Sequence, residues 1–235
     1  MASEPNEWTV LTWNVHGSEM PDITLLANVI RAEMPDVVVL QEIRKKQAAA
    51  LASALTYRYS WARKHFPYTR LLWWRAEGLA IMSPHALDVA GHTELSNNER
   101  SWSWRRRITQ WALIGKADSS AFMVYNLHLS PHDAPSDRRT EAVRLAAIVD
   151  GHGSDPAAIV AGDFNDSHDG SIIYALPGIE HLVPPDSSPA DAPTQLLDHV
   201  LLPAEAEHVS VAVPAGGTDW AEMSDHLPVT VRFQL

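Results

Sequence analysis

The chain has 235 residues, of which 46% are hydrophobic, with no cysteine and a formal net charge of −11. A chain of this length can bury a large core, and the lack of cysteine excludes disulfides, zinc–thiolate sites and a cysteine nucleophile. No stretch approaches the roughly 20 apolar residues of a membrane-spanning helix, and residues 1–7 lack the features of a secretory signal, so we expect a cytoplasmic protein.

The negative net charge conceals a basic, aromatic segment at residues 44–107. This segment holds 12 of the 18 lysines and arginines but only four acidic residues, and nine of its residues are aromatic. Cations interleaved with flat rings suit a groove that binds a phosphate backbone with splayed bases. Solvated charges over a partly buried aromatic core would give the same pattern, so both interpretations stay open.

The hydrophobic pattern predicts strands and helices in two similar halves. In the first half, a helix capped by Asp22 follows one strand and precedes another. The second half repeats this order of strand, helix and strand, and its helix carries Ala142, Leu145 and Val149 on one face. We expect one domain over residues 1–235, with long loops at about 62–77 and 92–107. The expected strands are residues 8–15, 36–40, 78–82, 87–91, 108–116, 121–129, 157–161, 196–202 and 228–235.

The apolar run at residues 159–161 stops at Gly162 and two polar residues, Asp163 and Asn165. Side chains alternate along a strand, so these two should project to the same side if the extended geometry persists that far. Carboxylate and carboxamide groups are hard ligands that suit magnesium, water and phosphate oxygens. Gly, Asp and Asn are also ordinary turn residues, so a simple turn after a buried strand is the alternative.

Polar residues end six of the expected strand regions, and ligands commonly collect at strand ends in layered α/β proteins. The six motifs are Thr12-Trp13-Asn14-Val15, Leu40-Gln41-Glu42, Asn126-Leu127-His128-Leu129, Gly162-Asp163-Phe164-Asn165, Leu197-Asp198-His199-Val200-Leu201 and Ser224-Asp225-His226-Leu227-Pro228-Val229. In this order the sequence resembles the endonuclease/exonuclease/phosphatase superfamily, whose members are similar to deoxyribonuclease I and to the exonuclease III-type abasic-site endonucleases.

The resemblance implies a four-layer α/β sandwich, in which two central mixed β-sheets are flanked by helices. It also implies that Mg²⁺ or Mn²⁺ assists the cleavage of a phosphate ester. By motif position, Glu42 would be the chief metal ligand, and Asn14 and Asp225 would help to form the metal site. Taken alone, Glu42 could instead form a salt bridge with Arg44.

The same resemblance implies roles for five further residues. His226 would be the general base or a phosphate contact, oriented by Asp198, since an imidazole titrates near neutrality and a carboxylate fixes its tautomer. Asp163 would position or deprotonate the attacking water, and Asn165 would hold that water or a phosphate oxygen. His128 would donate to a non-bridging or leaving oxygen.

Other assignments rest on fewer matching residues. Glu77 could orient His128, as a carboxylate does in the deoxyribonuclease I branch. Arg107 could contact the phosphate, although Arg105 or Arg106 could take that place. Asp166 adds a carboxylate where small residues are common in the family, and its role is open. Four histidines near the motifs have no assigned role: His16, His132, His168 and His199.

We therefore expect a divalent-metal-dependent phosphodiesterase, most simply a monomeric nuclease that cleaves a nucleic-acid backbone through an activated water. The alternative is a phosphatase, or a phospholipase or sphingomyelinase-like hydrolase, that acts on a small-molecule or lipid phosphate ester. A non-enzymatic binding module is disfavoured because no expected catalytic position is vacant.

Overall fold

The computed structural model describes residues 7–66, 69–97, 99–116, 121–167, 172–178 and 181–235. Its strands form two sheets. In spatial order, the six-stranded sheet consists of β10 (Glu207–Ala212), β11 (Val229–Gln234), β1 (Glu7–Asn14), β2 (Val37–Arg44), β4 (Glu77–Ser83) and β3 (Arg58–Arg63). The five-stranded sheet consists of β5 (Ala86–Glu94), β6 (Ile108–Gly115), β7 (Ala121–His128), β8 (Ala158–Asp163) and β9 (Asp198–Leu201).

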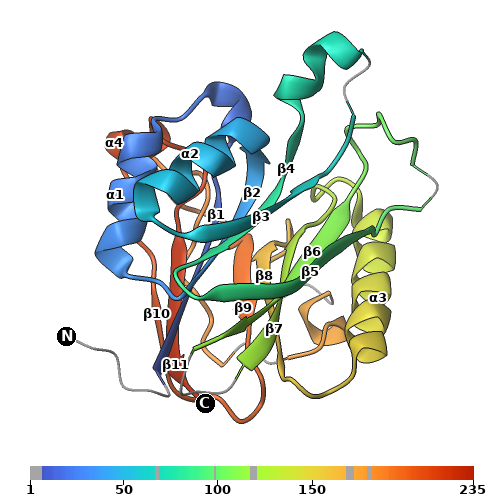
Figure 1. Cartoon of the computed structure of the whole chain (residues 1–235), viewed down its shortest axis with the longest axis vertical. Helices are drawn as coiled ribbons and strands as arrows, with labels where there is room; N and C mark the ends of the chain where they lie inside the picture. Colours follow the sequence, from blue (N-terminus) through green and yellow to red (C-terminus); the bar gives the residue numbers. More distant parts are fainter. Residues whose placement is uncertain (1–6, 67–68, 98, 117–120, 168–171, 179–180) are drawn as a thin grey trace.

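The helices cover the outer faces of the two sheets (Figure 1). Helices α1 (Ile23–Glu33) and α2 (Lys45–Leu55) lie on the six-stranded sheet, and α3 (Pro135–His152) lies on the five-stranded sheet. The remaining helical elements are short: η1 (Gly17–Glu19), η2 (Arg70–Arg75), η3 (Ile173–Ala175) and α4 (Thr218–Ala221). No helix in the described ranges is long and apolar enough to cross a membrane.

Side-chain alternation along β1 shows how the layers form. Trp8 and Val10 point into the apolar core between the sheets, where the Trp8 ring meets Phe122 edge to face at 4.2 Å. Leu11 and Trp13 point to the other side and join the core under α1 and α2. Each sheet thus has two buried faces, which confirms the four-layer α/β sandwich.

Several elements confirm the predicted pattern, and others depart from it. Helix α1 begins after Asp22, whose Oδ1 accepts a hydrogen bond from the Thr24 amide at 2.7 Å. The predicted loop at 62–77 was too long at its start and end, because β3 extends to Arg63 and β4 begins at Glu77. Helix α2 and strands β3 and β10 were not predicted.

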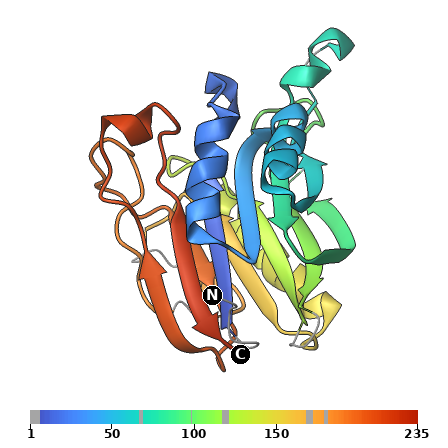
Figure 2. The ribbon, with the colours of Figure 1, turned by 60° about the vertical axis from the view of Figure 1, so that its left-hand side comes forward.

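Strand direction gathers the motif residues at one edge of the sandwich. The parallel pairs β1–β2 and β7–β8 end at this edge, and their antiparallel neighbours β4, β6, β9 and β11 begin there. The C-terminus lies at the opposite end, whereas η2 projects beyond the strand ends at the edge with the motifs (Figure 2). One edge therefore holds the polar ends of both sheets.

Candidate active site

The end of β2 presents Glu42 from a strained backbone. The pairing of β2 with β4 shifts register between Leu40 and Ile43, and Glu42 has a φ of 56°, which residues with a Cβ rarely adopt. Gly17 packs so closely against this bulge that a Cβ there would lie 2.4 Å from the Glu42 carbonyl oxygen. The bulge takes Glu42 out of the regular alternation of β2 and leaves its side chain partly exposed.

Glu42 does not form the salt bridge with Arg44 that was its alternative. The Arg44 guanidinium instead donates to Met20 Sδ at 3.0 Å and to the Ser18 carbonyl at 3.4 Å. Within the described ranges the Glu42 carboxylate accepts no hydrogen bond, and Oε1 lies 3.7 Å from His128 Nδ1. A carboxylate without a hydrogen-bond donor on a strained bulge is suited to binding a cation.

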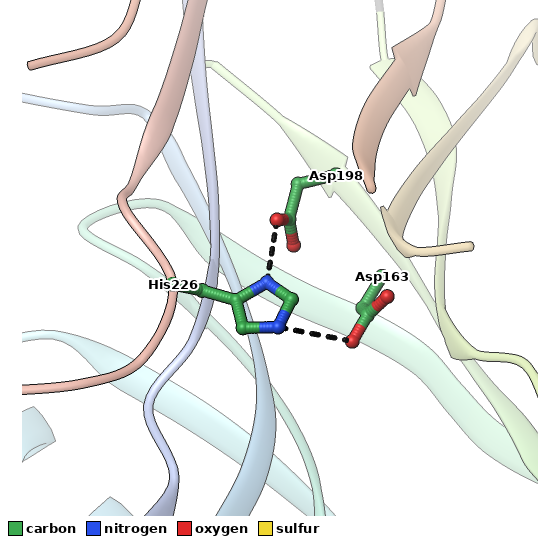
Figure 3. Close-up of side chains that lie close together, drawn as sticks. All are labelled: Asp163, Asp198 and His226. Atoms are coloured by element: carbon green, nitrogen blue, oxygen red, sulfur yellow. Dashed lines mark hydrogen bonds and ion pairs between the residues drawn. The ribbon is translucent and has the colours of Figure 1, made fainter. Parts of the chain in front are cut away.

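The His226 imidazole lies between two carboxylates (Figure 3). Its Nδ1 is 2.7 Å from Asp198 Oδ2, and its Nε2 is 3.9 Å from Asp163 Oδ2. Ser187 Oγ also donates to Asp198 Oδ2, at 2.6 Å. Burial opposes charge on the imidazole, but Asp198 and then Asp163 outweigh it and raise the pKa of His226 to about 10. Nδ1 therefore donates to Asp198, and Nε2 is a second donor.

Asp163 is the acceptor at the centre of the site. Its Oδ1 accepts from the Asn165 amide at 2.9 Å, and its Oδ2 accepts from Asn14 Nδ2 at 3.0 Å. Oδ2 also lies 3.5 Å from His128 Nε2. Burial raises the pKa of Asp163 to about 6, whereas the His226 charge and the two hydrogen bonds act in the opposite direction. Two hydrogen-bond donors and two imidazoles therefore lie around one buried carboxylate.

The extended geometry does not persist from Asp163 to Asn165. Strand β8 ends at Asp163, and Asn165 has a φ of 50°, so the turn alternative describes this segment. Asn165 Nδ2 donates to the Leu129 carbonyl at 3.0 Å rather than lying beside the Asp163 carboxylate. At Gly162, with a φ of 150°, a Cβ would lie 2.1 Å from the Leu127 carbonyl oxygen, so this position requires glycine.

His128 is buried and lies beside Glu42 rather than Glu77. Burial lowers the pKa of His128 well below its usual value, and the charges of Arg107, Lys64 and His226 add to this effect. Among the residues with described positions, no hydrogen bond joins His128 to Glu77. The neutral imidazole keeps one N–H that can donate to a ligand.

These contacts form one row across the facing edges of the two sheets. The row consists of three pairs of side chains. In each pair, one side chain comes from the end of β1, from the end of β2 or from the residues before β11, and the other comes from β7, β8 or β9. We call these six side chains the polar row. Its three cross-sheet pairs are His226–Asp198, Asn14–Asp163 and Glu42–His128.

Two sets of residues could hold a divalent metal ion. Asp163, Asp198 and His226 are buried and offer ligand atoms within 4.8 Å of one another. However, both nitrogens of a protonated imidazole carry hydrogen, so His226 would have to lose a proton before it could bind a metal. The predicted set offers oxygen donors alone, which suit a hard ion such as Mg²⁺. That set consists of Glu42, Asn14 and Asp225.

The residues without an assigned role fall around the polar row. His16 Nδ1 lies 3.4 Å from Asp225 Oδ1, and the His16 amide donates to Asn14 Oδ1 at 3.2 Å. His199 Nε2 contacts the Asp166 carbonyl at 2.9 Å, and Asp166 Oδ1 accepts from Arg138 at 3.3 Å, so both residues hold the segment after β8. His132 lines a cavity, described below, and His168 lies outside the described residues.

Three polar side chains near the row were missed by the sequence analysis. Ser187 lies in an irregular, proline-rich segment that gave no signal for its contact with Asp198. Lys64 is buried just after β3, in the segment predicted to be a loop. Ser224, whose Oγ donates to the Asn14 carbonyl at 2.6 Å, belongs to the last motif and could have been recognised there.

Known proteins with solved structures share the fold of this chain. A model of the endonuclease/exonuclease/phosphatase family matches residues 11–226. A family protein from Bacteroides thetaiotaomicron has the same fold, with a TM-score of 0.79, 18% identity, and coverage of 98% of this chain and 98% of that chain. The mannosyl-6-phosphatase of Bacteroides thetaiotaomicron VPI-5482 gives a TM-score of 0.78 at 18% identity, covering 97% of this chain and 100% of that chain.

Truncated TDP2 from Caenorhabditis elegans is also similar in structure, with a TM-score of 0.72, 15% identity, and coverage of 97% of this chain and 98% of that chain. At such identities, similarity between structures establishes the fold alone. A search of curated proteins found no match to the sequence.

Proposed function

Because the chain belongs to the endonuclease/exonuclease/phosphatase family, we propose that it is a divalent-metal-dependent phosphodiesterase that cleaves a nucleic-acid backbone. Members of this family are phosphoric ester hydrolases and generally depend on a divalent metal, so hydrolysis of a phosphate ester follows from membership. The family match also confirms the resemblance that the six motifs indicated. The nucleic-acid substrate is supported by one observation: arginines and exposed tryptophans gather at the edge of the sandwich that carries the polar row.

These residues, which we call the basic aromatic rim, come from η2 and from the segment before β6, together with Arg44 at the end of β2. Four tryptophans of the rim are between 39% and 57% exposed, although tryptophan is usually a highly buried residue. Phe66 N–H donates to the Ser101 carbonyl at 2.7 Å, so the two segments lie together. The rim pairs are Arg44 and Arg75 over Trp74 (5.8 and 5.0 Å), Arg100 over Trp102 (5.6 Å) and Arg105 over Trp104 (5.3 Å).

A rim of this composition suits a single-stranded or locally opened nucleic acid. Exposed rings provide surfaces on which bases can stack, and the arginines attract the phosphates between those bases. Because the whole chain carries a net charge of −11, a polyanion would approach it only at a local positive surface. The rim supplies that surface at the edge where the polar row lies.

By motif position, Glu42, Asn14 and Asp225 would hold the divalent ion, and the Glu42 carboxylate accepts no hydrogen bond within the described ranges. When bound, the ion would neutralise charge on the phosphate and stabilise the departing oxygen. The residues of the polar row would perform the other steps.

His226 would donate from Nε2 to a non-bridging phosphate oxygen, while Asp198 holds Nδ1 and thereby the orientation of the ring. Asp163 would accept a hydrogen bond or a proton from the attacking water, because its carboxylate is the acceptor on which the row converges. Asn165 Oδ1 and the neutral His128 would hold the water and an ester oxygen. In-line attack then breaks the bond between phosphorus and the leaving oxygen, which takes up a proton.

A second candidate function is the hydrolysis of a small phosphate ester, and a cavity beside Asn165 favours it. The cavity has a volume of about 830 Å³, within the usual range for small-molecule sites. Asp166 and Asp186 contribute to its lining, so it suits an uncharged polar group, such as a sugar, better than a polyanion. A sugar phosphate could place its sugar there and its phosphate at the polar row.

A turnover panel would separate these functions. It would offer single-stranded DNA, duplex DNA, an abasic-site duplex, RNA, mannose 6-phosphate and a choline phospholipid, with magnesium, manganese or chelator. Glu42→Ala and His226→Ala should abolish turnover. Glu205→Ala should leave it unchanged, because Glu205 is exposed and follows the end of β9 that lies away from the polar row. Trp74→Ala should raise KM for nucleic acid and leave a monoester unaffected.

Metal-dependent cleavage of a nucleic acid that Glu42→Ala and His226→Ala both lose would support the nuclease proposal. Hydrolysis of the monoester or the phospholipid alone would contradict it and favour the second candidate or its lipid counterpart.

A further inference from the structure

Two charged side chains of α3 are buried, and the mechanism above does not use them. Arg138 is 5% exposed and Glu141 is 2% exposed, and both belong to the helical face that packs on the five-stranded sheet. Further along this face the buried residues are apolar: Ala142, Leu145 and Val149. Burial of a charge is costly unless the charge gains partners. The partners of Arg138 and Glu141 therefore explain why the first two turns of this face are not apolar.

Glu141 holds the chain just after β7. Its Oε2 accepts a hydrogen bond from the Ser130 amide at 2.8 Å, and its Oε1 accepts one from the Ser130 hydroxyl at 2.7 Å. Burial raises the pKa of Glu141, whereas these two hydrogen bonds and the Arg107 charge act in the opposite direction. Ser130 is itself buried and comes two residues after His128. The carboxylate therefore fixes both the backbone and the side chain of a residue next to the site.

Arg138 ties the segment after β7 to the segment after β8. Its Nη1 donates to the Pro131 carbonyl, and its Nη2 donates to Asp166 Oδ1 at 3.3 Å. Pro131 belongs to the connection from β7 to α3, whereas Asp166 lies in the segment that follows β8. One buried guanidinium therefore joins both segments to the beginning of α3.

The residues that α3 holds lie next to the hydrogen bond that orients Asn165. Asn165 Nδ2 donates to the Leu129 carbonyl at 3.0 Å. The residue that follows Leu129 is the one that Glu141 holds. The residue that follows Asn165 is the one that Arg138 holds. Helix α3 therefore fixes the chain at both ends of the hydrogen bond that sets the direction of the Asn165 carboxamide.

His128 depends on the same support. It is the last residue of β7, and the Leu129 amide that follows it donates to the Asp163 carbonyl at 3.0 Å. Within the described part of the chain, the buried Nδ1 of His128 has no hydrogen-bond partner. The position of the ring is therefore set mainly by the backbone that carries it, and that backbone is held on one side by β8 and on the other by α3.

We propose that the two buried charges of α3 are positioning residues, which hold the ends of β7 and β8 so that His128 and Asn165 meet the ester and its attacking water. The placement of these two side chains stands on the contacts alone, whereas its effect on turnover rests on the proposed function. Asp166, the additional carboxylate of its motif, thereby gains a role, because it anchors Arg138 to the segment after β8.

Two substitutions of Glu141 test the proposal, with an ester of the panel that the parent hydrolyses. Glu141→Ala should lower kcat about ten- to hundredfold and leave KM within about twofold, because small displacements of groups that act in the transition state reduce the rate rather than binding. Glu141→Gln should keep kcat within about threefold of the parent. Its carboxamide oxygen can accept from the Ser130 amide, and its N–H can donate to the Ser130 hydroxyl oxygen.

Matched controls separate position from stability. Val149→Ala removes an apolar contact from the same face of α3, about two turns further from the site, and should lower thermal stability without changing kcat. Arg138→Gln should lower kcat, whereas Arg139→Gln removes the same charge from an exposed neighbour and should not. Where Glu141→Ala fails to fold, Arg138→Gln carries the same test. All rates would be measured at a temperature at which thermal unfolding shows each variant to be folded.

Nuclear magnetic resonance provides a measurement that needs no substrate. The Asn165 carboxamide and the His128 imidazole would be assigned by comparison with Asn165→Asp and His128→Gln. Both sets of resonances should move in Glu141→Ala and in Arg138→Gln, and they should stay in place in the two controls. A purely structural role would lower thermal stability without moving these resonances more than the controls do.

A kcat in Glu141→Ala or Arg138→Gln equal to that of its control would overturn the proposal, and so would unchanged resonances. Failure of Glu141→Gln to keep turnover would overturn it as well, because the hydrogen bonds to Ser130 would then not be the cause. If the resonances move but the parent hydrolyses no ester, the placement by α3 stands and the proposed function fails. If esters are hydrolysed while both variants keep the parent's kcat, the proposed function stands alone.

Discussion

Replacement of Asn126 by alanine should strongly destabilise the protein, because this side chain joins the two sheets beneath the site. Asn126 lies on β7 and is completely buried. Its Nδ2 donates to the Leu40 carbonyl at 3.0 Å and to the Ala80 carbonyl at 2.9 Å, both in the opposite sheet. Its Oδ1 accepts from Gln41 Nε2 at 2.8 Å. One side chain therefore makes three buried hydrogen bonds across the sandwich.

The cost follows from the groups that lose a partner in Asn126→Ala. Each buried group left unsatisfied costs about 1–3 kcal/mol, and the change affects two carbonyls and one side-chain amide. The carbonyls retain some compensation from the strand ladder, so we expect a loss of about 3–5 kcal/mol in the free energy of unfolding. For a chain of this length, that loss corresponds to a fall of about 6–20 °C in Tm.

Urea unfolding followed by tryptophan fluorescence would measure this loss, with an unchanged m-value as the check on the unfolded state. Gln110→Ala is the matched control, since Gln110 makes a single hydrogen bond between the same sheets, to Ser60 at 3.1 Å. We expect that control to lose about 1 kcal/mol. A loss in Asn126→Ala no greater than that in Gln110→Ala would refute the reasoning.

Three further changes test other parts of the structure. Ser187→Ala removes a 2.6 Å donor from Asp198 and should lower kcat/KM about tenfold with little change in Tm, measured on the best substrate of the panel. Gly162→Ala should destabilise by about 3–5 kcal/mol in urea unfolding, because its Cβ would lie 2.1 Å from the Leu127 carbonyl oxygen. Burial and neighbouring cations lower the pKa of His65 to about 4, so the folded state binds this proton less tightly than the unfolded state and loses stability as pH falls from 6.5 to 4. His65→Asn should therefore lose less stability than the parent between pH 7 and pH 5, and an equal loss in both would contradict this.

The sequence predicted the strands and helices that have a strong hydrophobic pattern or a clear capping residue. Strand β1 has a long apolar stretch that both cores need, and Asp22 marks the start of α1. Helix α2 was missed because it follows β2 without a breaking residue, and its alanine-rich sequence has only a weak apolar face. Strand β3 was missed because its side chains are mostly polar or aromatic and only partly buried, as on the last strand of a sheet.

The candidate site could be predicted as a set of residues but not as a set of contacts. The motifs named all six members of the polar row, although the roles of those residues remain predictions. Asn165 shows the limit within a motif, because its left-handed backbone sends the carboxamide to Leu129. Lys64 and Ser187 show the limit between motifs, because both lie in segments without a motif that only the folded chain brings to the site.

That register also couples stability to activity. Each pair of the polar row takes one member from each sheet, so a small slide of one sheet over the other would lengthen every contact in the row together. Gln41 precedes Glu42, and Asn126 lies two residues before His128, so the hydrogen bond between Gln41 and Asn126 lies directly beneath the Glu42–His128 pair. Loss of Asn126 should therefore lower turnover even at temperatures where the variant remains folded, because the bond that sets the spacing of the two sheets at the site is gone.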